Sequence, residues 1–217
     1  MKPILFNTEM VRAILEGRKT VTRRVVKTQH KDACGFYVTT RKSDGAFMGV
    51  YDYDDAESMY GSPQTPPYKV NDVLYVRETW RELIRPVGAP REFDYKADRD
   101  AKFLGLFKWK PSIHMPKEAA RIFLRVTGVR VERLKDITNE QILLEGVDKK
   151  QIENTLSQMP EPVDEWERGC YVFEWANLWD STVRDINHSW SGNPFVWVIE
   201  FERITKEQAY ELDRQQS

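Results

Sequence analysis

One segment, residues 120–134 (ARIFLRVTGVRVERL), constrains the fold of this chain more than any other. Its apolar residues alternate with arginine and glutamate: Ile122, Leu124, Val126, Val129 and Val131. Such alternation is typical of a β-strand with one buried face. Gly128 within the run predicts a bulge or a bend. The chain is therefore expected to build a sheet around this long strand.

Other patterns place further strands and helices around it. Short β-branched or alternating runs predict strands at residues 3–6, 20–26, 73–79 and 195–204. Helical spacing predicts helices at residues 9–16, at 138–146 and near 149–158 and 170–183. Strands outnumber helices, which favours the α+β class, with a small mixed and mostly antiparallel sheet or β-barrel flanked by helices.

The length of 217 residues fits one domain with inserted excursions. We expect this domain to span residues 1–204, with insertions at about 28–68 and 81–116 and a helical insertion at about 148–190. Residues 205–217 read as a polar tail. None of the excursions is long enough to form a core of its own.

Composition excludes several classes of protein. No apolar run approaches the roughly 18 residues that a membrane span needs, and residues 1–10 have too short an apolar stretch for a signal peptide. Cys34 and Cys170 are far apart, and the three histidines show no ligand spacing. We therefore expect a cytoplasmic protein without disulfide, metal or cofactor; the oligomeric state is left open.

Basic side chains gather in two segments, although the net charge is only −1. Residues 1–33 hold eight basic and three acidic side chains, and residues 117–135 hold six and two. If the two segments lie side by side in the fold, they would suit a phosphate-bearing partner. If they lie apart, they are ordinary solvated faces. The near-zero total charge disfavours a nonspecific nucleic-acid binder and favours a small nucleoside or a single flipped base.

The segment 14–24 (ILEGRKTVTRR) carries the densest set of candidate site residues. In a regular strand Thr22 and Arg24 share one face, while Arg23 lies on the other. Lys19 has the opposite parity to Thr22, so it reaches the same pocket only from the turn after Gly17 or across a bulge. The alternative is a basic edge strand whose charges prevent aggregation.

This segment resembles the signature of the ASCH domain, a member of the PUA-like superfamily of small β-barrels. Gly17, Lys19 and Arg24 match the family's helix–Gly–Lys–Arg pattern. The resemblance continues through residues 69–76, where Asn71 stands for the family's glycine, through 121–147 and into the last strand. Residues 109–116 (WKPSIHMP) and the Trp-rich C-terminal part are similar to larger family members from phages and prophages.

One branch of that family, the small bacterial N(4)-acetylcytidine amidohydrolases, is similar to this chain at the candidate catalytic residues. Its Gly-Arg-Lys-Thr-x-Thr-x-Arg run matches residues 17–24. The resemblance implies that Lys19, Thr22 and Glu145 are catalytic. Lys19 would activate the Thr22 hydroxyl, Glu145 would position water or return a proton to the amine, and Arg23 or Arg24 would stabilise the oxyanion.

Further substrate-binding candidates follow the strand at 73–79. Arg77, Glu78 and Trp80 are placed to stack on or hydrogen-bond a base. The alternative is cross-strand packing of Trp80 beside an exposed Arg77–Glu78 pair. His114 lies in the segment shared with the larger relatives, although a lone histidine is more often structural.

Three functions compete on this sequence. The first is a metal-independent amidohydrolase acting on N(4)-acylated cytosine nucleosides or a related modified base. The second is a non-catalytic module that binds RNA or a modified base, and the third is an ASCH-type ribonuclease. Nucleoside or RNA is the expected partner in all three, and no membrane is expected.

Overall fold

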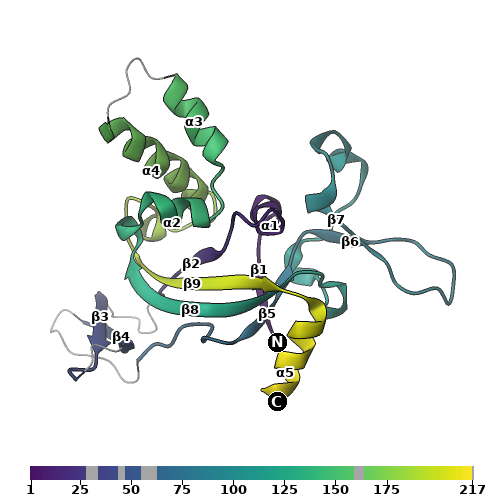
Figure 1. The fold of residues 1–217 in the computed structure, drawn as a ribbon, viewed down its shortest axis with the longest axis horizontal. Coiled ribbons are helices and arrows are strands. Elements are labelled where there is room, and N and C mark those ends of the chain that lie inside the picture. The colour runs from purple at the N-terminus through teal and green to yellow at the C-terminus, as the bar shows by residue number, and fades with distance from the viewer. Residues whose placement is uncertain (28–33, 44–46, 55–62, 159–163, 217) are drawn as a thin grey trace.

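The computed structural model describes residues 1–27, 34–43, 47–54, 63–158 and 164–216 (Figure 1). A five-stranded sheet forms its centre. In spatial order the strands are β1 (Lys2–Leu5), β5 (Val73–Arg77), β8 (Phe123–Arg133), β9 (Phe195–Ile204) and β2 (Val21–Val25). The β1–β5 pair is parallel and the other three pairs are antiparallel.

Strands β8 and β9 form the longest ladder. It runs from Phe123 opposite Ile204 to Arg133 opposite Phe195, with a register shift between Val126 and Gly128. The bulge predicted at Gly128 is therefore confirmed. An extra residue at this point lets the long strand bend while both halves keep their pairing with β9.

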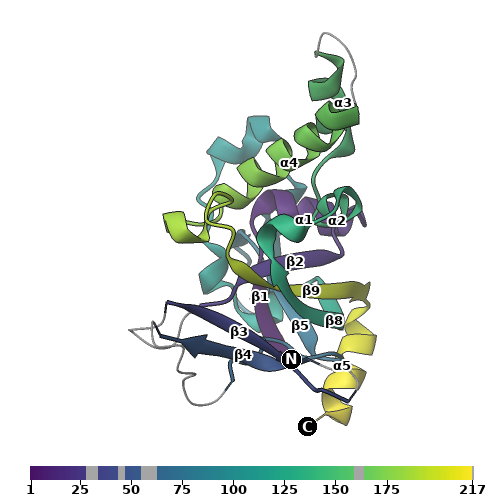
Figure 2. The same cartoon turned by 90° about the vertical axis from the view of Figure 1, so that its left-hand side faces the viewer.

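Five α-helices surround the sheet. Helices α2–α4 lie together on one side, and α5 lies beside the two chain termini (Figures 1 and 2). Their bounds are α1 (Thr8–Leu15), α2 (Asn139–Leu144), α3 (Lys149–Ser157), α4 (Asp164–Asp180) and α5 (Lys206–Gln215). α1 begins at Asn7, whose side chain accepts from Met10 N, and α2 begins with a capping box between Thr138 and Gln141.

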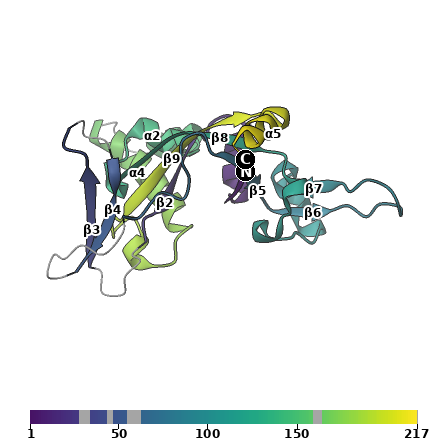
Figure 3. The ribbon, with the colours of Figure 1, turned by 90° about the horizontal axis from the view of Figure 1, so that it is seen from below.

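The first two excursions each contain a short hairpin. β3 and β4 form one and β6 and β7 the other, at opposite ends of the molecule (Figure 3). The strand bounds are β3 (Gly35–Thr40), β4 (Phe47–Tyr53), β6 (Trp80–Glu82) and β7 (Phe93–Tyr95). The sequence Ser43-Asp44-Gly45 is typical of a hairpin turn, and this segment lies partly outside the described residues.

Two cores lie on the two faces of the sheet, and β9 contributes to both. Its residues Trp197 and Ile199 belong to the first core, which includes Ile14 of α1. Val196 and Val198 belong to the second core, which holds buried side chains from α2, α3 and α4: Ile142, Ile152 and Trp175. Alternate residues of one strand thus pack against different helices, as the two-residue period of a strand dictates.

A third buried cluster lies at the other end of β8. It contains Trp80, Phe123 and Ala209 of α5. The N-terminal ammonium also forms an ion pair with Asp213 of α5. The segment expected as a polar tail therefore packs on the sheet as a helix.

The predicted α+β class and mostly antiparallel sheet are confirmed. Within the described residues, no backbone ladder joins the edge strands β1 and β2; the Arg24 guanidinium bridges them by donating to Leu5 O at 3.0 Å. Closure into a PUA-like barrel stays a prediction, as does the single-domain division at residue 204.

No helix in the described part of the chain is long and apolar enough to cross a membrane.

Two glycines at helix ends give a matched test of this geometry. Gly17 (φ 77°) has no neighbour within 4 Å of an added Cβ, whereas a Cβ on Gly146 (φ 95°) would lie 2.8 Å from Ala13 Cβ and 3.1 Å from Lys19 Cβ. Gly17→Ala adds only left-handed strain, about 1 kcal/mol. Gly146→Ala adds overpacking as well, so we expect a loss of about 3 kcal/mol in the free energy of unfolding. Urea unfolding measures both; equal losses would contradict the close approach of Gly146 to Lys19.

Candidate functional site

Lys19 lies in the turn that joins α1 to β2. Gly17 ends the helix in left-handed backbone (φ 77°). The amides of Arg18 and Lys19 then both donate to Ala13 O, at 2.9 and 3.0 Å. Lys19 therefore precedes β2, and the alternation of the strand does not fix the direction of its side chain. A place in the turn after Gly17 is one of the two positions from which Lys19 was expected to reach the pocket of Thr22.

Glu145 is brought to the same place by the end of α2. It is the C-cap residue of that helix, and Gly146 after it adopts left-handed backbone (φ 95°). The helix end is joined to the start of β2 by Thr20 N, which donates to Leu144 O at 2.9 Å. Lys19 and Glu145 form an isolated antiparallel bridge beside it.

The Lys19 ammonium and the Glu145 carboxylate form a buried ion pair. Lys19 Nζ donates to Glu145 Oε2 at 2.6 Å, to Glu145 O at 2.8 Å and to Val21 O at 2.8 Å. All three ammonium hydrogens thus have an acceptor. The two residues are 1% and 2% exposed. Burial lowers the pKa of Lys19 below its ordinary value of 10.5, and the attraction of Glu145 offsets this only in part.

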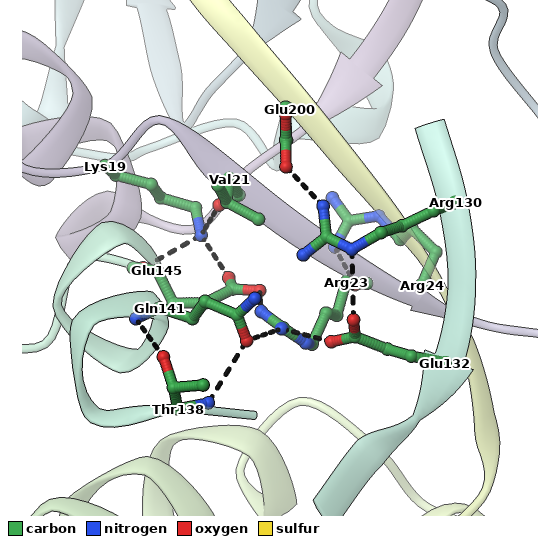
Figure 4. A network of polar contacts seen from close by, with 10 residues as sticks. All are labelled: Lys19, Val21, Arg23, Arg24, Arg130, Glu132, Thr138, Gln141, Glu145 and Glu200. Carbon is green, nitrogen blue, oxygen red and sulfur yellow. Dashed lines mark hydrogen bonds and ion pairs between the residues drawn. The ribbon is translucent and has the colours of Figure 1, made fainter. Parts of the chain in front are cut away.

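Arg23 extends the pair into a network of alternating charge (Figure 4). Its Nη1 donates to Glu145 Oε1 at 3.0 Å, and its Nη2 donates to Gln141 Oε1 at 3.0 Å and to Glu132. Glu132 in turn accepts from Arg130 Nε at 3.1 Å, and Arg130 pairs with Glu200. The network runs from the buried pair to the protein surface, so only its inner end is strongly desolvated.

Thr22 and Arg24 point to the other face of β2. They lie opposite Ile199 and Trp197 in the ladder, and directly opposed residues share a face. Arg24 Cζ lies 5.4 Å from the centroid of the Phe6 ring, and Lys19 Nζ lies 5.7 Å from the same centroid. Lys19 therefore reaches the side of the strand that carries Arg24. Burial lowers the pKa of the Arg24 guanidinium.

The Thr22 hydroxyl is not joined to the ion pair. Thr22 is 1% exposed, and within the described part of the chain its side chain has no recorded hydrogen bond. The structure thus brings Lys19 and Arg23 onto the Glu145 carboxylate and places Thr22 beside Arg23 on β2, facing the other way and without a bond to these groups.

The other four predicted residues form no hydrogen bond or ion pair with Lys19 or Glu145 among the described residues. Glu78 is buried and is held by Arg121, whose Nε and Nη2 donate to its two oxygens at 2.9 and 3.0 Å. Burial raises the pKa of Glu78, although Arg121 opposes this. The Arg77–Glu78 pair considered above is therefore not formed.

Trp80 and Arg77 are engaged in the second hairpin and its neighbours. Trp80 is 3% exposed, and its ring centroid lies 5.7 Å from that of Phe93. This is the cross-strand packing that the sequence analysis gave as the alternative to base stacking. Arg77 donates to Ile113 O, and His114 is exposed in the short turn that follows.

Sequence reasoning missed Glu132 and Gln141 as partners of Arg23. Arg130 and Glu132 are two apart on a strand and so share a face, which was the available signal for their pairing. Gln141 was recognised only as part of a capping box; its oxygen accepts from Thr138 N and from Arg23 at once. Among the described residues, no group of three or more His, Cys, Asp or Glu side chains is arranged to hold a metal ion.

The buried pair predicts a characteristic pattern of stability changes. Lys19→Met leaves the buried Glu145 carboxylate with Arg23 alone, and Glu145→Gln leaves the buried Lys19 ammonium without a carboxylate, so we expect each to lower the free energy of unfolding by about 3 kcal/mol. The double variant is expected to cost clearly less than the sum. Arg125→Met, which breaks the exposed pair with Glu202, is the control and costs less than about 1 kcal/mol. Chemical unfolding of all four proteins measures this; additive losses would contradict direct coupling.

No family model matches the chain, and no curated protein matches it. A search of solved structures finds the crystal structure of protein EF3133 from Enterococcus faecalis V583, described as DUF984, with a TM-score of 0.34 and 10% sequence identity. The alignment covers 94% of this chain and 82% of that chain. The resemblance to the ASCH family therefore stays a prediction.

Proposed function

We propose that this chain is a metal-independent amidohydrolase that removes an acyl group from the exocyclic amine of a cytosine-type base. One observation carries the proposal. Lys19 and Glu145, two residues that the family resemblance names as catalytic, are 126 positions apart in the chain and meet in a buried ion pair. A buried charge pair adds little net stability, so stability alone is a weak reason to keep it.

The short contact between the two groups offers a route for a proton. Burial lowers the pKa of Lys19, so its ammonium gives up a proton more readily than an exposed lysine does. Transfer of one proton from Lys19 Nζ to Glu145 Oε2 frees an electron pair on the lysine nitrogen. Lys19 then acts as the base, and Glu145 holds the proton that the leaving amine needs.

The reaction then proceeds in two balanced halves. Lys19 removes the proton of the Thr22 hydroxyl, and the oxygen attacks the acyl carbon. The carbon–nitrogen bond breaks as Glu145 delivers its proton to the departing amine, which leaves an acyl ester on Thr22. Water hydrolyses this ester to the free acid and restores the hydroxyl and the ion pair. Arg24, on the Thr22 face, is the candidate for stabilising the oxyanion.

A binding-only function has its own support. A cavity beside the ion pair is lined by Arg23, Arg24 and further cations. A module that reads a modified base without changing it would use this cavity and keep the Lys19–Glu145 pair as structure alone. The two functions differ in whether substrate is consumed.

Deacetylation of N(4)-acetylcytidine, followed by chromatography, tests the proposal. Lys19→Arg keeps the charge but not the ability to lose a proton, and Glu145→Gln removes the acid; both are expected to abolish turnover. Thr22→Ser retains the hydroxyl and activity, whereas the isosteric Thr22→Val loses activity. Lys117→Arg is a conservative control elsewhere, and a chelator leaves the rate unchanged. Folded wild-type protein without turnover would overturn the proposal.

The pH profile separates this mechanism from one with a free lysine base. In this mechanism Lys19 and Glu145 share one proton. Turnover therefore falls at high pH, where the pair loses that proton. Because burial lowers the pKa of Lys19, this alkaline limb is expected to have its midpoint below 10.5. If a deprotonated Lys19 acted alone, the rate would instead rise with pH over the same range.

A further inference from the structure

A cavity of about 1060 Å³ runs along β2 next to the ion pair. Arg23 connects the two, because it borders the cavity and donates to Glu145; Lys19, Thr22 and Glu145 are not among the residues that line the cavity. The remaining walls come from the β3–β4 hairpin, from residues 182–188 after α4 and from the start of β9. Figure 3 shows β2, β3, β4 and α4 together at one end of the molecule, away from the β6–β7 hairpin.

Positive charge dominates this cavity. Five cationic residues border it: Arg23, Arg24, Lys27, Arg133 and Arg184. The Arg23 side chain is enclosed and paired with Glu132 and Glu145, which leaves four cations against one carboxylate. The carboxylate is that of Asp185, which already accepts from Asn187 N at 3.0 Å and lies 3.8 Å from His188 Nδ1. Within the described part of the chain, no ion pair is recorded for Lys27, Arg133 or Arg184. Three of the cations therefore have no carboxylate partner among the residues that the structure describes.

A buried donor at the inner end also lacks a partner. Arg23 is 2% exposed, and its Nε–H has no hydrogen-bond acceptor. An unsatisfied buried donor costs about 1–3 kcal/mol. Arg23 borders the cavity, but its side chain is 0% exposed, so a ligand in the cavity does not reach this donor while the network is closed.

Aromatic rings alternate with the charges. Phe36, Tyr53, Trp179 and Phe195 line the same cavity. The Arg133 guanidinium lies 3.8 Å from the centroid of Phe195, and Phe36 meets that ring edge-on at 6.1 Å. Cations that follow a backbone, interleaved with rings on which bases stack, are the features of single-strand nucleic-acid grooves.

We propose that this cavity binds the phosphate backbone of a single-stranded nucleic acid, so that the reacting base is presented within a strand rather than as a free nucleoside. A free nucleoside has no phosphate to meet the four open cations. The reaction at the base rests on the proposed function; the binding of the strand does not, and so the two are tested separately.

Fluorescence anisotropy with a single-stranded RNA of about ten nucleotides tests the binding. Four phosphate contacts give a slope of about −2.8 for log affinity against log salt, and Lys27→Ala/Arg133→Ala/Arg184→Ala reduces it to about −0.7. The affinity of this triple variant falls about 100-fold at 0.1 M salt. Lys108→Ala/Lys150→Ala/Lys206→Ala removes the same charge from exposed positions outside the cavity and leaves both values unchanged. Equal behaviour of the two triple variants would overturn the proposal.

Competitors and substrates decide the rest. Cytidine 5′-monophosphate is expected to compete far more weakly than the strand, and polyglutamate not at all; equal competition by either would overturn the single-strand assignment. In a turnover assay the wild type prefers N(4)-acetylcytidine within a strand over the free nucleoside, and the cavity variant loses that preference. Strand binding without hydrolysis would support the cavity and overturn the hydrolase. Nucleoside hydrolysis without strand binding would support the hydrolase and overturn the proposal that the cavity binds a strand.

Discussion

The contact between Lys19 and Glu145 is the buried charge pair among several bonds that join distant parts of the chain. It fixes the turn after α1 to the end of α2, and through the neighbouring backbone bond from Thr20 to Leu144 it fixes both to the start of β2. Because the two charges are buried, neither is stable without the other. Arg23, which the ladder with β9 holds opposite Val198, donates to the same carboxylate.

Much of the fold was predictable because it depends on local signals. Alternation predicted β8 and β9, Gly128 predicted the bulge, and Thr138 with Gln141 predicted the start of α2. Asn71, which stands in a turn, does adopt the left-handed backbone that it tolerates (φ 71°). The β6–β7 hairpin was not predicted, since its three-residue strands are too short to show a period.

The site was predictable only in part, for a related reason. The turn at Lys19 is local, whereas the bonds from Arg23 to Glu132 and Gln141 join three elements that are distant in sequence. Trp80 shows a second limit: an aromatic residue after a strand suits a stacking surface and a buried cluster equally well. In the structure Trp80 packs against Phe93. The sequence around Trp80 gives no sign that Phe93 will be its neighbour.

The sharing of β9 between two cores restricts where the length of this chain can change. Deleting or adding one residue within β9 would turn Trp197 and Ile199 toward α2–α4 and Val196 and Val198 toward α1, so both cores would be lost in one step. Adding or deleting residues in the segments that connect the strands does not turn any strand over, so both cores are kept. The three excursions all leave the sheet between strands, and the one ladder that must keep its register is uninterrupted apart from its bulge.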